Sequence, residues 1–337
     1  MITASPLARQ QNRWQRELAA AITDPRELCR LLDLDPSLAL QGAAAEAQFP
    51  LRVPRGFVRR MRRGDLSDPL LLQVLPRTQE SVEHPGFEGD PLQEYAAART
   101  PGLLHKYQGR ALLVTTGACA VHCRYCFRRE FPYQEQQVGG RWREALAVIA
   151  ADPSIEEIIL SGGDPLSLSD ARLAALTSAL ARIPHLQRLR LHTRTPIVLP
   201  ERVDAGLTDW LGSLPWPVAI VLHANHANEI DSEVQTALRQ LRDSGAVLLN
   251  QSVLLAGVND SIEALQALSE ALWRAGVLPY YLHLLDRVRG AAHFEVSEPR
   301  ARQLGAALAA RLPGYLVPRL VREVAGAPAK VALLPTV

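Results

Sequence analysis

Six short apolar runs alternate with longer amphipathic windows between residues 111 and 285. Strands covered on both faces of a parallel sheet are apolar throughout, whereas the connecting helices need only one apolar face. The windows end near glycine or proline, which are helix stop signals. The expected strands span residues 111–117, 156–162, 188–193, 218–223, 247–254 and 279–285. This pattern predicts an α/β fold, a partial (βα)6 barrel.

Polar residues cluster where these expected strands end. GACAVHCRYC begins at residue 117, SGGD at 161, HTR at 192, HANH at 223 and NQS at 250, and Asp286 follows the sixth strand. Ligands bind at the C-terminal ends of the strands in parallel βα barrels. We therefore expect one binding site, formed by side chains from all six units.

The segments on either side of the barrel have other patterns. Proline-rich connections separate three expected helices, at residues 14–22, 24–34 and 49–61, and an irregular stretch follows them. After the barrel we expect a helix over 297–312 and a strand on each side of a small-residue turn within 320–335. The expected division is an N-terminal helical extension (1–100), the barrel (101–295) and a C-terminal helix and strand segment (296–337).

Three of the four cysteines, Cys119, Cys123 and Cys126, lie within one short segment. They are too close together and odd in number for a secreted disulfide framework. Three thiolates in one loop can hold three irons of a four-iron cluster and leave the fourth iron without a protein ligand. Zinc is the alternative, but a zinc site needs a fourth ligand, and His122 is poorly placed for it. Cys29 is expected to be a small buried hydrophobe.

Charge limits the chemistry further. Lys106 and Lys330 are the only lysines among the 37 lysine and arginine residues, so a reaction that needs a neutral amine has two candidates. A net charge of +2 gives no general case for nucleic-acid binding. The arginines of residues 55–63 could bind phosphates or an acidic partner, although such a cluster is more often a solvated helix face.

The chain shows no signal for a membrane. Its first 18 residues lack the apolar centre of a signal peptide, and no later run approaches the length of a membrane span. The sequence therefore predicts a cytoplasmic protein that makes no membrane contact.

The CxxxCxxC spacing together with SGGD resembles the radical S-adenosylmethionine superfamily. A narrower likeness covers roughly residues 45–337, where five motifs together resemble the lysine 2,3-aminomutase family. These motifs are CRYCFRREF (123–131), SGGDPLSL (161–168), HTRTPIVLPER (192–202), NQSVLLAGVND (250–260) and GAAHF (290–294). The short length is similar to the branch that makes (R)-β-lysine for elongation factor P.

The resemblance implies three cofactors. The three cysteines would hold a [4Fe-4S] cluster, and its open iron would bind S-adenosylmethionine. Pyridoxal phosphate would be carried on Lys330, whose neighbours in GAPAK are small enough to let the ring approach the backbone. The remaining cofactor contacts implied are Ser161, Gly162, Gly163 and Asp164 for S-adenosylmethionine, and Lys106, Tyr107, Arg110 and Gln251 for pyridoxal phosphate.

The implied reaction is an isomerisation that moves the amino group of L-lysine from C2 to C3. Arg128 would bind the substrate carboxylate, and Asp286 and Glu323 would bind its distal ammonium. Glu323 stands where the enzymes that act on free lysine carry aspartate, which would reshape the pocket. Arg287 and Arg289 could instead pair with Asp286 and make it structural. The segment after Lys330, VALLP, also departs from the family pattern, and the sequence lacks the additional cysteines with which some longer relatives bind zinc.

The resemblance also implies partners: an electron donor such as flavodoxin or ferredoxin, and a functional link to elongation factor P and its lysine ligase. No nucleic-acid partner is expected. Two alternatives remain at this level. One is a radical enzyme that modifies RNA or another macromolecule, docks through residues 55–63 and does not need Lys330. The other is a non-enzymatic iron–sulfur or zinc protein. The sequence does not decide whether the substrate is free lysine or a lysine attached to a protein. It also does not identify the electron donor or decide whether the chain forms a homo-oligomer.

Overall fold

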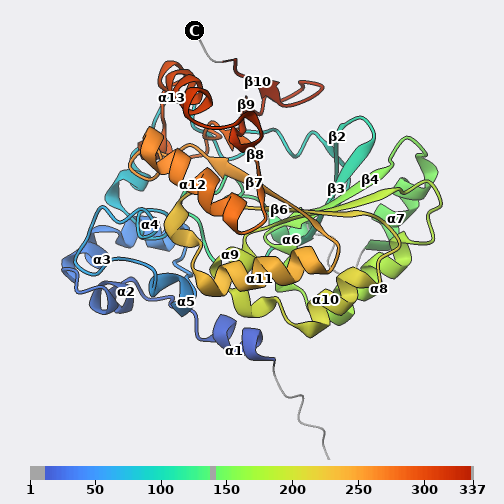
Figure 1. The fold of residues 1–337 in the computed structure, drawn as a ribbon, viewed down its shortest axis with the longest axis horizontal. Helices are drawn as coiled ribbons and strands as arrows, with labels where there is room; N and C mark the ends of the chain where they lie inside the picture. The colour runs from blue at the N-terminus through green and yellow to red at the C-terminus, as the bar shows by residue number, and fades with distance from the viewer. Residues whose placement is uncertain (1–11, 137–141, 335–337) are drawn as a thin grey trace, which may run out of the picture.

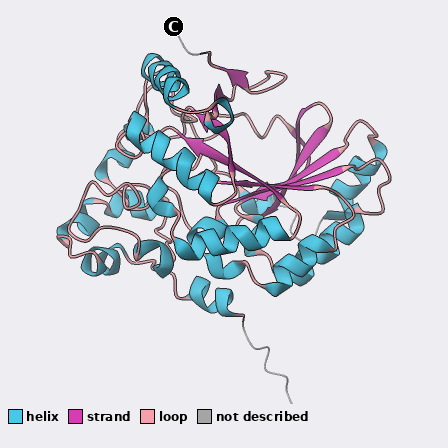
Figure 2. Ribbon diagram, viewed as in Figure 1, coloured by secondary structure: helices cyan, strands magenta, loops and turns pink. Residues whose placement is uncertain are grey.

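The computed structural model describes residues 12–136 and 142–334. Within these ranges the chain forms one curved sheet of ten strands, which follow each other across the sheet in chain order (Figures 1 and 2). The strands are β1 (Ala98–Thr100), β2 (Leu103–Tyr107), β3 (Arg110–Thr116), β4 (Glu157–Gly162), β5 (Arg188–Thr193), β6 (Val218–Leu222), β7 (Val247–Val253), β8 (Leu278–His283), β9 (Arg319–Arg322) and β10 (Val331–Ala332). The described strands leave the sheet open between β1 and β10.

The six predicted strands are confirmed as β3 to β8, and their bounds differ from the predicted ones by two residues at most. All six pair in parallel, as a partial barrel requires. The strands predicted on each side of the small-residue turn are confirmed as β9 and β10. The sequence pattern did not indicate that β9 would pair in parallel with β8. The antiparallel strands β1 and β2 precede β3, and β10 pairs antiparallel with β9 across the predicted small-residue turn.

Side chains alternate between the two faces of each strand, so that one face of the sheet packs in the main hydrophobic core and the other faces the inside of the barrel. Leu113, Leu160, Leu191, Ile220 and Leu248 align in register across β3 to β7, and all are buried in the main hydrophobic core. Successive side chains of a strand point to opposite faces of the sheet. The neighbours of these five residues on each strand therefore face the inside of the barrel.

Helices cover the outer face of the sheet, one after each strand from β3 to β8 (Figure 1). They are α7 (Trp142–Ala151), α8 (Asp170–Leu180), α10 (Ala205–Gly212), α11 (Ser232–Asp243), α12 (Ile262–Arg274) and α13 (Glu298–Arg311). Four begin at a side-chain cap: Asp204, Asp231, Ser261 and Ser297 each accept a hydrogen bond from a backbone amide of the first turn. The sequence predicted all six helices.

The N-terminal part differs more from the prediction. Its helices are α1 (Arg13–Ala19), α2 (Pro25–Leu31), α3 (Ser37–Gln41), α4 (Ala43–Gln48) and α5 (Arg55–Val58). The helix predicted over residues 49–61 is wrong except for α5. Pro50 and Pro54 disfavour helical backbone in the residues before them. Val53 instead pairs with Ile22 in an antiparallel β-bridge. The sequence analysis missed α3 and α4. Residues 1–11, on which part of the signal-peptide prediction rests, lie outside the described ranges.

The N-terminal helices support the cysteine loop. Their core, which includes Trp14, Leu28 and Phe57, extends to Ala120 and Val121 between the cysteines. Cys29 is fully buried in this core, as predicted. The short helices α6 (Tyr133–Gln136) and α9 (Thr195–Val198) follow the cysteine loop and β5. Within the described residues no helix combines the length and apolar character needed to cross a membrane.

Candidate active site

The inside of the barrel holds a cavity of about 640 Å³, and every site residue predicted from the sequence lines it. The tertiary structure therefore brings together the cysteine loop after β3, the SGGD segment after β4 and the two lysines at the ends of the sheet. The lining residues predicted from the sequence are Lys106, Tyr107, Arg110, Cys119, Cys123, Cys126, Arg128, Ser161, Gly162, Gly163, Asp164, Gln251, Asp286, Glu323 and Lys330.

The three cysteines form no disulfide, and all three line the cavity wall. Burial raises the pKa of Cys119, and burial together with Cys123 raises the pKa of Cys126 to about 11. Thiolates at these positions therefore need positive charge nearby, which bound iron supplies. Within the described ranges no three His, Cys, Asp or Glu side chains converge on a single-ion position. His122 stacks on Phe49, and its Nδ1 lies 2.8 Å from the Pro50 carbonyl oxygen.

Buried arginines fix the cysteine loop to Glu80, which lies in the 3-10 helix η1 (Thr78–Ser81) before β1. Arg124 lies between Cys123 and Cys126 and forms a fully buried ion pair with Glu80, at 2.7 Å. Arg129 approaches the same carboxylate, at 2.9 Å. A carboxylate shared by two buried guanidinium groups holds the loop in one arrangement, because breaking either pair leaves a buried charge without a partner.

Two glycines let the SGGD backbone approach the cysteine loop. A Cβ atom on Gly162 would lie 2.6 Å from the Thr116 carbonyl oxygen, and one on Gly163 would lie 2.4 Å from that of Ala118. Gly162 also has a φ of 117°, which side-chain-bearing residues rarely adopt. The SGGD backbone thus lies directly against the loop that carries the cysteines, as a ligand shared by the two segments requires. The Asp164 carboxylate also makes hydrogen bonds outside this loop.

Asp164 joins β4 to the end of β5. Its carboxylate accepts hydrogen bonds from the Thr193 hydroxyl, at 2.7 and 2.9 Å, and from the backbone amides of Arg194 and Thr195, at 2.8 and 3.0 Å. A carboxylate with this many hydrogen bonds holds the surrounding backbone in place.

Arg128, the expected carboxylate ligand, already has a buried partner. Its Nε and one terminal nitrogen lie 2.6 and 2.8 Å from the two oxygens of Glu94. Its other terminal nitrogen donates to Ser161 Oγ at 3.1 Å. Glu94 is a residue that the sequence analysis missed. It gives no motif signal because it lies far upstream in the irregular stretch before β1.

The two lysines meet through one carboxylate. Glu323 Oε2 lies 2.6 Å from Lys330 Nζ, and its Oε1 lies 3.2 Å from Lys106 Nζ. Lys106 also lies 3.3 Å from Glu94. Burial would raise the pKa of Glu323, but the two lysines outweigh it and hold this pKa at about 2. A chain of alternating charges therefore runs from Arg128 through Glu94, Lys106 and Glu323 to Lys330.

Asp286 stands apart from this chain. Burial, reinforced by the charge of Glu323, raises the pKa of its carboxyl to about 7. The arginines that could have neutralised it have other partners, since Arg287 pairs with Glu295 at 2.7 Å and Arg289 with Glu130 at 3.0 Å. Asp286 is thus a cavity carboxylate without an ion-pair partner among the described residues, suited to binding a cation.

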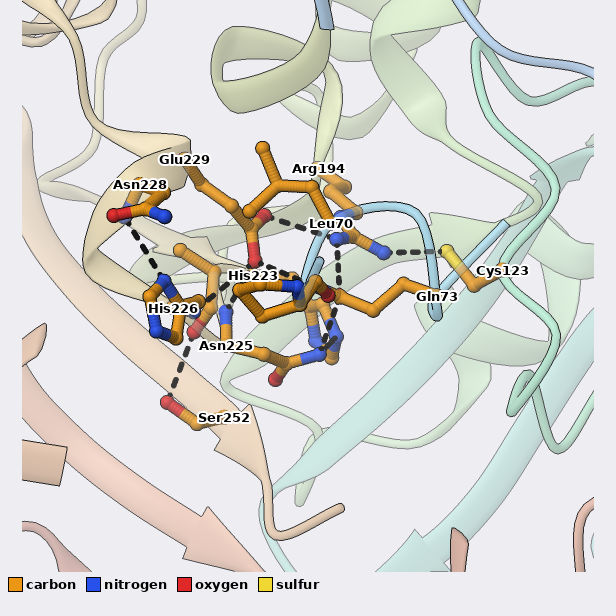
Figure 3. A network of polar contacts seen from close by, with 12 residues as sticks. Leu70, Gln73, Cys123, Arg194, His223, Asn225, His226, Asn228, Glu229 and Ser252 are labelled. Carbon is orange, nitrogen blue, oxygen red and sulfur yellow. Dashed lines mark hydrogen bonds and ion pairs between the residues drawn. The ribbon is translucent and has the colours of Figure 1, made fainter. Parts of the chain in front are cut away.

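Sequence reasoning assigned no role to several other residues of the cavity. His192, His223 and His283 line it, and burial lowers the pKa of each, for His223 to about 3. Arg194 lies at the end of β5 in a buried network with Gln73, Glu229 and Cys123 (Figure 3). The HTR and HANH motifs at strand ends were the available signal, but they do not reveal which side chains face one another.

The basic cluster at residues 55–63 is neutralised on its own surface. Arg55 pairs with Glu27 at 2.5 Å, and Arg60 is buried beside Asp231, at 3.6 Å. The other three arginines also have acidic neighbours: Arg59 with Glu233, Arg62 with Asp65 and Arg63 with Asp33. Apart from the buried Arg60, these arginines are solvated and paired, which fits a solvated face and gives no support to an RNA-docking surface.

Known proteins resemble this chain along almost its whole length. Residues 108–188 match the 4Fe-4S single cluster domain family. The L-lysine 2,3-aminomutase of Escherichia coli (strain K12) is 51% identical over 322 residues, which cover 95% of this chain and 94% of the relative. That of Haemophilus influenzae (strain ATCC 51907 / DSM 11121 / KW20 / Rd) is 46% identical over 331 residues and 98% of each chain. Among solved structures, a radical SAM methyltransferase from Sphaerobacter thermophilus covers 65% of this chain and 68% of its own, with a TM-score of 0.46 and 18% identity.

Proposed function

Because the chain belongs to the L-lysine 2,3-aminomutase family of radical S-adenosylmethionine enzymes, we propose that it moves the amino group of L-lysine from C2 to C3 and forms (R)-β-lysine. The family consists of isomerases, and the chain is one of them. This assignment overturns the alternative of a non-enzymatic iron–sulfur or zinc protein.

The proposal includes pyridoxal phosphate on Lys330. It is carried by one observation: the only two lysines of the chain line the same cavity and share the carboxylate of Glu323. A cofactor with an aldehyde and a phosphate needs one amine to bond and cations for its phosphate. Lys330 would supply the amine that bonds to the aldehyde, while Lys106 and Arg110 would supply the positive charge for the phosphate. Tyr107 and Gln251 also line the cavity. Tyr107 would contact the phosphate as well, and Gln251 would be a further contact of the cofactor.

The bound groups supply the radical chemistry: the cluster provides the electron that splits S-adenosylmethionine, and pyridoxal phosphate delocalises an unpaired electron on the substrate. The protein supplies position and exclusion of water. Asp286 would bind the distal ammonium of lysine, since it has no ion-pair partner among the described residues and lies in the cavity. A cation there would favour its charged form.

Arg128 would bind the substrate carboxylate while Glu94 holds its guanidinium in place. Because Glu94 also contacts Lys106, the same carboxylate links the substrate end of the site to the phosphate end. Glu323 neutralises the two lysines in the protein without ligands, and it would be a second carboxylate for the substrate ammonium.

We further propose the biological setting from the motif resemblance. The product would serve the modification of elongation factor P, together with its lysine ligase, in the cytoplasm. An electron donor such as flavodoxin or ferredoxin would reduce the cluster. The three-part division at residues 100 and 295 is proposed from the change in sequence pattern. The N-terminal helices have a hydrophobic core of their own that extends to the cysteine loop, whereas the segment around α13 and β9 shares its core with β8 and α12.

The experiment is a product assay on anaerobically reconstituted full-length protein with S-adenosylmethionine, pyridoxal phosphate and a reductant. Free L-lysine is supplied with and without elongation factor P, and β-lysine is measured by mass spectrometry. Formation of (R)-β-lysine from the free amino acid is expected. Cleavage of S-adenosylmethionine without β-lysine in either arm would contradict the proposed substrate.

A further inference from the structure

Arg194 places a guanidinium nitrogen against a sulfur of the cysteine loop. It follows β5 and is buried, with 6% of its surface exposed. One terminal nitrogen donates to Cys123 Sγ at 2.8 Å, as the dashed line in Figure 3 shows. This contact belongs to neither the substrate pocket around Asp286 nor the lysine pair, and the proposed function assigns it no task.

A rigid network holds the guanidinium in this position. The second terminal nitrogen of Arg194 lies 2.9 Å from Glu229 Oε2 and 2.7 Å from Gln73 Oε1. Glu229 is itself fully buried, and its other oxygen accepts from the backbone amides of Asn225 and His226, at 2.9 and 3.1 Å. The carboxylate therefore cannot move to another partner without losing several hydrogen bonds.

The backbone of Arg194 has a second fixed contact. Its amide donates to Asp164 Oδ2 at 2.8 Å, within the SGGD segment that lies against the cysteine loop. The first nitrogen also donates to the Tyr125 hydroxyl, inside the CxxC part of the motif. Arg194 is thus anchored on both sides of the loop, and its orientation toward Cys123 is set by the fold.

We propose that Arg194 is a positioning residue that sets the reduction potential of the cluster through its hydrogen bond to Cys123. Reduction adds one electron, and the added negative charge is shared with the thiolate sulfurs. A cationic donor in a site shielded from water stabilises that charge, and hydrogen bonds to the sulfurs are among the factors that set such potentials. Glu229 limits the effect because it offsets part of the cationic charge.

The inference rests on a cluster held by Cys123, and it needs neither lysine nor pyridoxal phosphate. The test uses full-length protein, reconstituted anaerobically with iron and sulfide and titrated without S-adenosylmethionine, cofactor or substrate. The midpoint potential is followed by the electron paramagnetic resonance signal of the reduced cluster, and iron and sulfide content is measured for each sample. Failure to form β-lysine would therefore contradict the proposed function without affecting this measurement.

Arg194→Gln removes the donor and the positive charge. We expect the equilibrium constant for reduction to fall by about tenfold or more, which is about 59 mV for one electron. Glu229→Gln keeps the donor and removes its counter-charge, so its midpoint potential should rise above that of the wild type. The variant that carries both Arg194→Gln and Glu229→Gln should have a lower midpoint potential than Glu229→Gln alone, because the two proteins differ only in the guanidinium.

Two features keep the result decisive. If Arg194→Gln fails to hold iron because Glu229 is left as a buried unpaired charge, the comparison of the double variant with Glu229→Gln still isolates the guanidinium. Arg202→Gln is the matched control, since Arg202 is fully buried and paired with Asp170 at 2.6 Å but contacts no cysteine. Midpoint potentials equal to the wild type in all three site variants, at full iron content, would overturn the proposal.

Discussion

The Nζ atom of Lys330 lies 2.6 Å from Oε2 of Glu323, seven residues earlier in the chain. The two meet because β9 and β10 pair antiparallel with Arg322 opposite Val331, so the next residues toward the turn face each other. The same carboxylate reaches Lys106 at the end of β2, on the opposite side of the open barrel. One acidic side chain therefore connects the first and the last part of the sheet.

Replacing Lys330 should separate cofactor loss from cluster loss. Lys330→Arg keeps the positive charge beside Glu323 but cannot form an imine, because arginine does not deprotonate in proteins. We expect loss of the visible absorbance of lysine-bound pyridoxal phosphate and of β-lysine formation, with iron content unchanged. Retained modification of RNA by this variant would instead favour the macromolecule-modifying alternative.

Glu323→Gln should destabilise the ligand-free protein by about 1–3 kcal/mol, because a neutral amide leaves the two lysines to repel each other. The pKa of Glu323 is lowered from 4.5 to about 2, so the contribution is present above pH 4.5 and is lost as the pH falls to 2. Urea denaturation at pH 7 and at low pH measures the difference. Added pyridoxal phosphate should stabilise this variant more than the wild type, since its phosphate replaces the missing negative charge.

Asp286 should give the enzyme a pH dependence near neutrality. Its pKa is raised from 3.8 to about 7, so the folded protein binds more protons than the unfolded chain between these values and loses stability as the pH rises through them. Asp286→Asn should remove this loss and be the more stable protein at pH 8. The same variant should raise KM for lysine and abolish the fall of kcat/KM below pH 7. Unchanged KM would rule out Asp286 as the ammonium ligand.

Glu80→Gln tests whether the ion pairs with the 3-10 helix η1 (Thr78–Ser81) hold the cluster loop in place. Arg124 and Arg129 would be left buried without their shared carboxylate, and we expect a loss of about 3–5 kcal/mol in the free energy of unfolding. Iron content after reconstitution should fall with it. Glu83→Gln, at an exposed position close in sequence, is the control and should change neither quantity. Full iron content in Glu80→Gln would show that the loop forms without this anchor.

The sequence alone determined the order of the strands and the type of chemistry. Apolar runs of strand length recur at regular spacing, and burial on both faces leaves them few other structures, so β3 to β8 could be predicted almost to the residue. The cysteine spacing and the two lysines restricted the cofactors for a similar reason, since few residue types can ligate iron or form an imine.

The tertiary structure decided which side chains meet. Glu94 and Lys106 are separated by a hairpin, Arg194 and Gln73 by more than a hundred residues, and no local pattern records either contact. Short elements such as α3 and α4 were missed because they are too short to show a periodicity and depend on tertiary contacts. In the structure α3 packs against α2, and the Ala45 carbonyl of α4 accepts a hydrogen bond from Arg124 of the cysteine loop. Local preferences act over a few residues, whereas the charges of this site are paired because a curved, open sheet brings its two ends, far apart in the chain, to one cavity.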